Sequence, residues 1–593
     1  MSNPRSMNAS SRPKQKTSHI LRRLLAYLGP SKWALLLACI FAVLGNSLAL
    51  LSPRLSGLAI DAISGSSVDF PLVYRFAFLM VLTALLSAAI SLAQSAVMIR
   101  ISRRIVRKMR QDLYDHLTVL PVSFFDTHQT GDVISIISYD VDTVGSSLST
   151  DITQMISSLI TVVGSFSMML SISPVLLLVF AFTIPLSILF TRYRARVVRP
   201  LFRSRSRALG ELNGFAEEAV SGLRTIRAYH KEDAFCTRFA SFNQKAAFAT
   251  WKAGSTACVT GPTVNCISNL SLALVSIFGS LLFMRGGISL GGVSSFVLYS
   301  RKFSGPINEF ANLIAELQSS LAAAERVLSL CDLPPEIPDA PDAKPLSACR
   351  GEVSVSHVSF SYEPEKEILH DVNFTVRPGE TIAIVGETGC GKTTLINLLM
   401  RFYDVSSGAI LLDGEDIRNL RRSDLRRQYT MVLQDTWLFD GTIAENLAYG
   451  RPDATREEII QAAKAAHIHE MIMGMPDGYD TQLTDGGGSI SKGQKQLLTI
   501  ARAMLMDARM LILDEATSNV DTRTEFLIQE AMVSLMQGRT CFIIAHRLST
   551  ITGCDRILVM DHGRLVESGT HDELLRKNGM YAALYAAQFD QPA

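Results

Sequence analysis

Long stretches without a charged residue are the feature that most limits the folds open to this chain. A helix needs about 20 mostly apolar residues to cross a bilayer. The longest uncharged stretch has 40 residues and contains the turn-like Ser171-Ile172-Ser173-Pro174, so we expect it to form a two-helix hairpin. The uncharged stretches cover residues 34–53, 76–99, 152–191, 253–284 and 286–300.

These stretches predict six membrane-spanning helices. The sixth has the weakest hydropathy, because Arg301, Lys302, Glu309 and Glu316 lie in it or at its end. Charge inside a membrane is costly. Arg301 and Lys302 are therefore expected either to face an aqueous cavity that attracts anionic or zwitterionic groups, or to extend toward an interface. Buried helices of a soluble protein are the disfavoured alternative. The predicted spans are 34–53, 76–99, 152–171, 174–191, 260–284 and 289–315.

The basic residues predict the orientation in a cell membrane. The first 32 residues contain seven Lys or Arg and no acidic residue, which favours a cytoplasmic N-terminus. Residues 20–28 mix apolar and basic side chains, as an interfacial helix does. The connections between spans two and three, and between spans four and five, are long and rich in Arg, so both are expected in the cytoplasm. The C-terminal half follows on the same side.

The C-terminal half has a different character. A proline-rich segment at 333–341 reads as a linker, and no later uncharged stretch is long enough to span a membrane. Short apolar runs alternate there with helical stretches, which predicts an α/β domain with a largely parallel sheet. The total charge is only +2, so no nucleic-acid partner is expected. The expected strands are Thr381–Val385, Ala409–Leu412, Met510–Leu513 and Cys541–Ala545.

A glycine-rich segment after the first of these strands predicts phosphate binding. Gly386-Glu387-Thr388-Gly389-Cys390-Gly391-Lys392-Thr393 fits the pattern G-x-x-x-x-G-K-[ST] and leads into a helix that begins near Thr394. Its backbone N–H groups can surround phosphates, Lys392 can reach the β- and γ-phosphates, and the Thr393 hydroxyl can bind Mg²⁺. A nucleotide site is therefore expected here.

Two adjacent acids follow another apolar strand. The run Met510-Leu511-Ile512-Leu513 delivers Asp514 and Glu515 to the end of a buried strand. Asp514 can hold Mg²⁺ or its water shell, and Glu515 can act as the general base toward an attacking water. Ordinary solvated acids are the alternative, which the phosphate loop in the same domain disfavours.

These elements together resemble the ATP-binding cassette (ABC) transporters, and the chain from about residue 20 to 590 is similar to an exporter half-transporter of the multidrug or lipid type. Ile490-Ser491-Lys492-Gly493-Gln494 stands where the family has Leu-Ser-Gly-Gly-Gln. Ile490 and Lys492 depart from that pattern. The resemblance implies that Ser491, Gly493 and Gln494 contact ATP held by the opposite subunit.

The same resemblance assigns further residues. Tyr362 is implied to stack on adenine, Gln434 to contact Mg²⁺, and Asp521 to form part of an inter-subunit loop. His546 resembles the histidine that contacts the γ-phosphate. The catalytic residues implied are Glu515 and His546, and the Mg²⁺ ligands are Thr393, Gln434 and Asp514.

The expected architecture is a six-helix transmembrane domain of the exporter type plus an α/β P-loop nucleotide-binding domain. The expected function is ATP-driven export of a hydrophobic or amphipathic drug, lipid or peptide by a dimer. The run from Thr517 to Glu525 resembles the competent half of heterodimeric exporters, so a heterodimer is favoured over a homodimer. An importer of the siderophore type on this fold and a non-transporting regulatory ATPase remain alternatives. The expected segments are a basic N-terminus with an interfacial helix (1–32), the transmembrane domain (33–318), a linker (319–350) and the nucleotide-binding domain (351–590).

Overall fold

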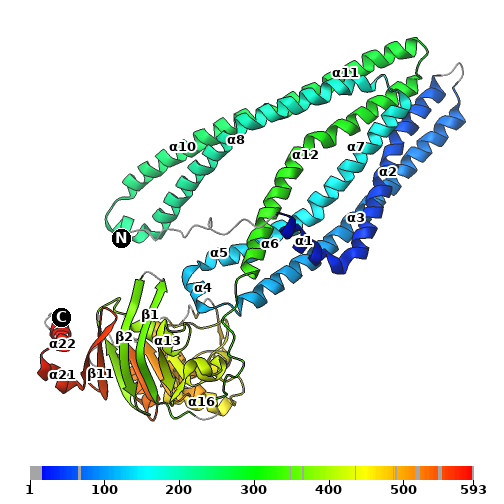
Figure 1. The fold of residues 1–593 in the computed structure, drawn as a ribbon. Helices are drawn as coiled ribbons and strands as arrows, with labels where there is room; N and C mark the ends of the chain where they lie inside the picture. Colours follow the sequence, from blue (N-terminus) through cyan, green and yellow to red (C-terminus); the bar gives the residue numbers. More distant parts are fainter. Residues whose placement is uncertain are drawn as a thin grey trace. The chain divides into compact units, whose positions relative to one another are not determined.

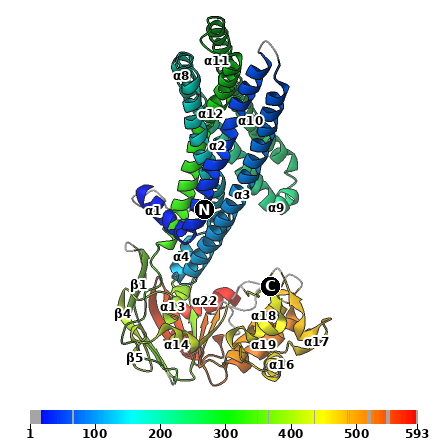
Figure 2. The same ribbon diagram turned by 90° about the vertical axis from the view of Figure 1, so that its right-hand side faces the viewer.

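The computed structural model describes residues 17–64, 68–346, 349–363, 366–433, 436–484, 486–487, 490–514, 521–544 and 551–589, without the side chains of 17, 307–312, 588 and 589. The chain divides into two compact units. Unit 1 comprises residues up to 119 together with 129–333, and unit 2 comprises 120–128 together with the residues from 334 onward. The two units are drawn in Figures 1 and 2 and are described separately.

All regular secondary structure in the described residues of unit 1 is helical. Helices α2, α3, α7 and α12 run side by side, whereas α8, α10 and α11 form a second group that meets the first through α12 (Figure 1). The helices are α1 (Thr17–Leu28), α2 (Lys32–Ile63), α3 (Phe70–Leu117), α5 (Thr130–Ser135), α6 (Val141–Ser146), α7 (Ile152–Ile172), α8 (Leu177–Ser221), α9 (Leu223–Ala228), α10 (Glu232–Cys258), α11 (Thr260–Met284) and α12 (Leu290–Cys331).

Four predicted spans fall within α2, α3, α7 and α11, whereas 174–191 begins three residues before α8 and 289–315 begins one residue before α12. Five helical stretches are long and apolar enough to cross a membrane, and together they contain the first five predicted spans. The sixth predicted span falls in α12, which is not among the five. Helix α3 has 48 residues, so at 1.5 Å per residue it extends about 72 Å, far beyond a hydrocarbon core of about 30 Å. The five stretches are Ser18–Ile63, Phe70–Leu117, Thr130–Ile172, Pro174–Ser221 and Glu232–Met284.

Side chains of α12 donate hydrogen bonds to backbone carbonyls of α2 near Pro53. Pro53 has no backbone N–H, so the carbonyl of Ala49 loses its usual donor within the helix. Lys302 Nζ donates to this carbonyl at 2.5 Å. Tyr299 Oη donates to the Leu50 carbonyl at 2.5 Å, and Ser295 Oγ donates to the Pro53 carbonyl at 2.9 Å. Lys302 therefore binds a backbone carbonyl in this structure.

The two helices remain in close contact toward the start of α12. A Cβ added to Gly57 would lie 2.4 Å from the Gly291 carbonyl oxygen, so the two backbones approach more closely than side chains permit. Asp61 accepts hydrogen bonds from Ser289 Oγ at 2.8 Å and from the Gly291 N–H at 2.7 Å. Helices α2 and α12 are thus joined along several turns.

Unit 2 contains two larger sheets and a helical region (Figure 2). The six-stranded sheet has the order β12-β11-β3-β10-β9-β6, and only β12 runs antiparallel to its neighbour. Its strands are β3 (Thr381–Val385), β6 (Tyr429–Val432), β9 (Met510–Asp514), β10 (Thr540–Ile544), β11 (Arg556–Asp561) and β12 (Arg564–Gly569). The helices are α4 (Val122–Thr127), α13 (Lys392–Leu399), α14 (Arg422–Arg427), α15 (Ile443–Leu447), α16 (Arg456–Ala465), α17 (His469–Met473), α18 (Lys492–Met506), α19 (Thr522–Met536), α21 (His571–Lys577) and α22 (Met580–Phe589).

Both faces of the six-stranded sheet are covered. Ile382 and Ile384 of β3 belong to one hydrophobic cluster, and Ala383 and Val385 belong to another. A central parallel strand buried on both faces is uniformly apolar. This burial explains why the run Thr381–Val385 does not alternate between polar and apolar residues.

One predicted strand lies in a different sheet. Ala409–Leu412 was expected in the parallel sheet, but it is part of β4, which pairs antiparallel with β1. Val355 lies opposite Ile410 in that pairing. The prediction of a single largely parallel sheet is therefore wrong for this strand. The second sheet has the order β2-β1-β4-β5, with β1 (Val353–Glu363), β2 (Lys366–Val376), β4 (Ser407–Leu412) and β5 (Glu415–Asp416), and β7 (Gly441–Thr442) pairs with β8 (Gln482–Leu483).

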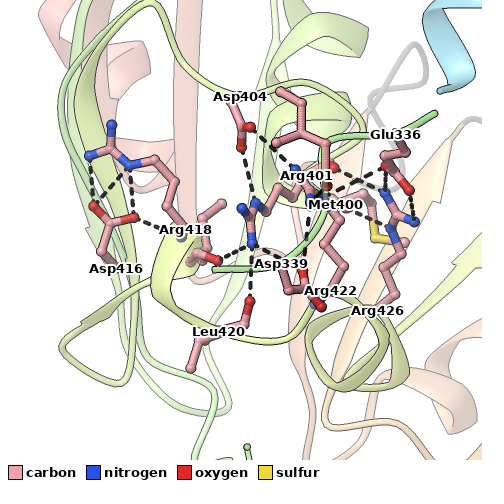
Figure 3. Close-up of polar contacts among 12 residues, drawn as sticks. Glu336, Asp339, Met400, Arg401, Asp404, Asp416, Arg418, Leu420, Arg422 and Arg426 are labelled. Carbon is pink, nitrogen blue, oxygen red and sulfur yellow. Dashed lines mark hydrogen bonds and ion pairs between the residues drawn. The ribbon is translucent and has the colours of Figure 1, made fainter. Parts of the chain in front are cut away.

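The segment predicted as a linker, residues 319–350, begins with a helical part and continues with residues that contact unit 2. Helix α12 ends at Cys331, so residues 319–331 are helical. Glu336 and Asp339, from the proline-rich segment, form ion pairs with Arg426 and Arg422 of α14 (Figure 3). These contacts fix the proline-rich segment to unit 2.

Candidate functional site: a phosphate loop at the edge of a parallel sheet

The predicted phosphate loop connects β3 to α13. Gly386 has φ +154° and Gly391 has φ +104°, a region that favours glycine. A Cβ on Gly386 would lie 2.2 Å from the Met560 carbonyl oxygen, and one on Gly391 would lie 2.6 Å from Leu369 Cδ2. The loop therefore requires glycine at both positions for conformation and for space.

Lys392 is folded into this loop. Its residue is 6% exposed, and Nζ donates hydrogen bonds to the carbonyl oxygens of Gly386 at 2.8 Å and Glu387 at 2.9 Å. Cys390 Sγ lies 3.8 Å from the same ammonium group. Thr393, the next residue, is exposed. A positive charge thus stands at the centre of a glycine-rich loop at a helix N-terminus, where phosphate groups bind favourably.

The strand register brings the predicted carboxylate to the same edge of the sheet. In β10, Ile544 lies level with Ile384 of β3 on one side and with Asp514 of β9 on the other. The phosphate loop and Asp514 consequently follow strand ends at one edge, where ligands of parallel sheets bind. Three other predicted site residues, Glu515, His546 and Gln434, lie outside the described residues.

The described part of the site suits magnesium. Asp514 supplies a carboxylate and Thr393 a hydroxyl, which are the hard oxygen ligands that Mg²⁺ prefers. Across the described ranges, no group of three or more His, Cys, Asp or Glu side chains could form a metal cage. Mg²⁺ commonly binds through one or two protein oxygens plus substrate phosphates, so this sparse donor set fits the ion.

An aromatic cluster lies beside the start of α13. Tyr362 Oη is 3.3 Å from Thr394 Oγ1, and the Tyr362 ring contacts the rings of Phe360 and Tyr403 edge-on, with centroid distances of 4.9 and 5.0 Å. Tyr362 remains 46% exposed. An exposed aromatic ring held next to the phosphate loop is well placed to stack on a nucleotide base.

Tyr403 links this cluster to α4 and was not predicted. Its hydroxyl donates to Asp126 Oδ2 at 2.6 Å. Burial raises the pKa of Tyr403, and the Asp126 carboxylate adds to the rise, so the phenol stays protonated and keeps donating. The partners are separated by 277 residues, and no local pattern in the sequence signals such a contact.

The predicted signature residues form the start of α18. Ser491 is the N-cap: its Oγ accepts from the Gln494 N–H at 3.3 Å, and Gln494 Oε1 accepts from the Ser491 N–H at 3.1 Å. This reciprocal pair is a capping box. Lys492 occupies the first helical position and is exposed, whereas Gly493 is buried. The Lys492 departure therefore leaves the local helix start intact.

Asp521 begins α19 in the same manner. Its side chain accepts from the Thr524 N–H at 3.0 Å, and this bond lowers the pKa of the carboxyl. Helix α18 packs against α15, α16 and α19, whereas α13 packs against β2. The signature helix α18 and the phosphate-loop helix α13 therefore pack against different elements of unit 2.

Comparison with known proteins decides the family. A family model described as "ABC transporter transmembrane region" matches residues 35–307, and one described as "ABC transporter" matches residues 369–518. An uncharacterized ABC transporter ATP-binding protein, YfiC of Bacillus subtilis, is 41% identical over 588 residues, which are 98% of this chain and 96% of that protein. The chain belongs to the ABC transporter family.

Other members of the family show similarity over nearly the whole chain. The fatty acid ABC transporter ATP-binding/permease protein of Mycobacterium tuberculosis is 44% identical over 89% of this chain and 83% of its own length. The ATP-dependent lipid A-core flippase of Legionella pneumophila is 36% identical over 97% of both proteins. A bacterial Atm1-family ABC exporter with ATP bound has a similar structure, with a TM-score of 0.77, 30% identity and coverage of 95% of this chain and 99% of that one.

These comparisons confirm the predicted family and the predicted combination of an exporter-type transmembrane domain with a nucleotide-binding domain, whereas the count of six spans stays a prediction. The chain is an ABC exporter half-transporter, with one transmembrane region followed by one nucleotide-binding domain. It is a multi-pass cell-membrane ATPase that binds ATP and couples its hydrolysis to transport as a dimer.

Proposed function

We propose that this ABC exporter moves a lipid-like amphipathic molecule across the cell membrane. The ATP dependence of this transport is supported by the strand register, which brings the phosphate loop and Asp514 to one edge of the sheet. The substrate class is supported by relatives named as a fatty acid transporter and a lipid A-core flippase. The helices of unit 1, whose apolar side chains are largely exposed, suit a bilayer.

The nucleotide site is proposed to work as follows. The phosphate-loop N–H groups and the Lys392 ammonium bind the β- and γ-phosphates, and Tyr362 stacks on adenine. When bound, Mg²⁺ would neutralise developing negative charge on the phosphates. Its proposed ligands are Thr393, Asp514 and Gln434. Glu515 accepts a proton from the attacking water, and His546 contacts the γ-phosphate. The proposed loop contacts come from Gly386, Glu387, Thr388, Gly389, Cys390, Gly391, Lys392, Thr393 and Thr394.

The second half of each ATP site is proposed to come from the other subunit. Ser491, Gly493 and Gln494 at the start of α18, together with Asp521, would face the ATP of that subunit. We favour a heterodimer, since the run from Thr517 to Glu525 resembles the competent half of such exporters. Copurification from native membranes with a single tagged copy checks this, because a homodimer would bring down only copies of itself.

The proposed topology has six spans, with α12 as the sixth, and a cytoplasmic N-terminus and nucleotide-binding domain. The seven basic residues in the first 32 positions support this orientation. Protease treatment of right-side-out and inside-out vesicles tests it. Cleavage within the nucleotide-binding domain is expected only in inside-out vesicles.

Glu515→Gln tests the catalytic assignment. ATP binding should persist, while hydrolysis at this site should slow by about 10²- to 10⁴-fold, the usual contribution of a general base. Glu457→Gln, an exposed acid on α16, is the matched control and should leave turnover unchanged. In a heterodimer the partner's site is silenced first. Wild-type turnover by Glu515→Gln would overturn the assignment.

A further inference from the structure

The short segment that follows α12 is anchored at its first residues to other helices of unit 1. Arg23 Nη1 of α1 lies 2.6 Å from each carboxylate oxygen of Asp332, the first residue after α12. His116 Nε2, near the end of α3, donates to the Leu333 carbonyl at 3.0 Å. One side chain and one backbone group therefore fix the chain directly after α12.

The same segment is anchored to unit 2 from Glu336 onward (Figure 3). Glu336 Oε1 accepts from Arg426 Nη2 at 2.5 Å. Both carboxylate oxygens of Asp339 accept from the Arg422 backbone N–H at 3.2 Å. Asp339 Oδ1 also pairs at 3.5 Å with Nη1 of the Arg422 side chain, which is only 9% exposed. The segment is thus held against a buried charge of unit 2.

Arg426 connects this second anchor to the phosphate-loop helix. Its Nη2 also donates to the Arg401 carbonyl at 3.0 Å, and its Nε donates to the Met400 carbonyl at 3.3 Å. Met400 is the C-cap of α13, and the last carbonyls of a helix have no donor within it. Arg426 therefore bridges Glu336 and the C-terminal end of the helix that begins at Lys392.

Helix α13 is a rigid link between this bridge and the phosphate loop. It has 8 residues, so at 1.5 Å per residue it is about 12 Å long. Four of its side chains are buried in one hydrophobic cluster, namely Leu395, Ile396, Leu398 and Leu399. Closely packed interiors transmit displacement rather than absorb it. A movement of Lys392 on nucleotide binding is therefore expected to reach Arg426.

Only Pro334 and Pro335 lie between the two anchors. Proline fixes its own φ at about −65°, and the residue before a proline is restricted to extended conformations. Proline-rich segments consequently act as semi-rigid spacers. Both prolines are exposed, so they contribute little to packing, and their main contribution is to restrict the backbone.

We propose that Pro334-Pro335 is a strut that carries nucleotide-driven movement of α13 to α12, with Glu336 and Arg426 as positioning residues at its unit 2 end. A flexible connection in its place would lose such a displacement in its own conformational freedom. The strut goes beyond the proposed function, since it requires neither a particular substrate nor a direction of transport.

Hydrogen–deuterium exchange of the full-length transporter in lipid nanodiscs tests the strut. Exchange is compared between the nucleotide-free protein and the protein trapped with MgATP and vanadate, for peptides from 386–399 and from 313–331 of α12. The strut variant is Pro334→Gly/Pro335→Gly. The matched control is Pro338→Gly/Pro341→Gly, which changes two exposed prolines of the same segment outside the strut.

In the wild type we expect trapping to slow exchange in both regions by about fivefold or more, the scale of a typical coupling between sites. In the strut variant the change in α12 should fall below about twofold, while the change at 386–399 and the basal ATP hydrolysis stay within about twofold of wild type. The control variant should keep both changes.

Glu336→Ala tests the unit 2 anchor without altering the prolines. Arg426 can still donate to the carbonyls at the end of α13, so the change at 386–399 should persist while the change in α12 falls. Asp342→Ala removes an exposed acid of the same segment and should leave both changes in place.

Three results would overturn the strut. A wild-type change in α12 of the strut variant would show that movement reaches this helix by another route. Equal losses in the strut variant and in its control would show that flexibility anywhere in the segment has the same effect. Loss of the change at 386–399 in the strut variant would show that the prolines act on nucleotide binding itself.

The wild-type protein separates the strut from the proposed function. Absence of any trapping-dependent change in its α12 would contradict the strut alone. Absence of ATP-driven transport by the wild type would instead contradict the proposed function, whatever the exchange result.

Discussion

Two arginine clusters, one in each unit, differ in how many carboxylates accompany them. In unit 2, three arginines meet three carboxylates (Figure 3). Arg401 Nε lies 3.0 Å from Asp404, Arg422 lies 3.3 Å from Asp404 and 3.5 Å from Asp339, and Arg426 lies 2.5 Å from Glu336. In unit 1, Arg103, Arg107 and Arg110 line a groove with only Asp142.

The two arginine clusters also differ in burial. The side chains of Arg401 and Arg422 are 5% and 9% exposed, whereas Arg103 and Arg107 are exposed to solvent. Buried charge is tolerated when it is paired and hydrogen-bonded. The first cluster therefore holds the proline-rich segment and the loops around α14 together. The arginines of the second cluster are exposed and hold no buried network together.

The largest effect is expected from Arg401→Met. Arg401 also donates from Nη1 to the carbonyls of Ile417 at 2.9 Å and Leu420 at 3.0 Å, so its loss removes one donor from Asp404 and one from each of these two carbonyls. Breaking a buried pair costs about 3–5 kcal/mol. Thermal unfolding of the purified transporter should show a clearly lower transition for unit 2.

The control for this experiment lies in the same region. Arg418 pairs with Asp416 at 2.7 Å, but its side chain is 43% exposed. Exposed ion pairs contribute about 0–1 kcal/mol. If Arg418→Met and Arg401→Met lowered the transition equally, burial would not explain the difference between the pairs.

A smaller loss is expected from Asp140→Asn in unit 1. The Asp140 side chain is 4% exposed and accepts from Arg326 Nε at 2.7 Å and Nη2 at 2.5 Å. The Arg326 side chain is 55% exposed, so water can replace part of the lost interaction. We expect a loss of about 1.5–3 kcal/mol, the range for hydrogen bonds to charged groups.

Asp142→Asn supplies the contrast, because the Asp142 side chain is 63% exposed. Its effect on the unfolding transition should be small, because exposed ion pairs contribute about 0–1 kcal/mol. A loss as large as that of Asp140→Asn would contradict the role given to burial.

Lys302→Met should cost about 1–3 kcal/mol, because it removes the donor that Lys302 supplies to the Ala49 carbonyl. Pro53→Ala restores a backbone N–H that can bond to this carbonyl. The double variant should therefore lose less stability than the sum of the two single losses. Simple additivity would show that Lys302 does not act through the Ala49 carbonyl.

The smallest effect on stability is expected from Arg107→Gln. An exposed arginine without an acidic partner contributes within about 0.5 kcal/mol to folding. The thermal transition of the purified transporter should stay in place. A large loss of stability would place this arginine with the buried, structural cluster and remove the distinction between the units.

Local patterns in the sequence predicted much of the molecule. The uncharged runs predicted the spans, because crossing a bilayer requires a continuous apolar stretch. The phosphate loop was predicted because glycine, lysine and threonine must occur at fixed spacing around phosphates. The roles of Glu515, His546 and Gln434 stay predictions.

Local sequence patterns could not predict contacts between residues that are far apart in the chain. Lys302 and Ala49 are 253 positions apart, and a lysine in a helix does not reveal which carbonyl it will meet. Ala409–Leu412 looks like any apolar strand, and only its pairing with β1 assigns it to the antiparallel sheet. The buried arginine cluster depends on acids from the proline-rich segment, where sequence analysis indicated only a linker.

ATP-dependent movement of a fluorescent fatty acid in inside-out membrane vesicles tests the central claim most directly. The account predicts that the vesicle lumen accumulates the fatty acid when ATP is added, and that Glu515→Gln abolishes this accumulation. ATP-dependent loss of fatty acid from loaded vesicles, or equal accumulation by wild type and Glu515→Gln, would contradict ATP-driven export by this protein.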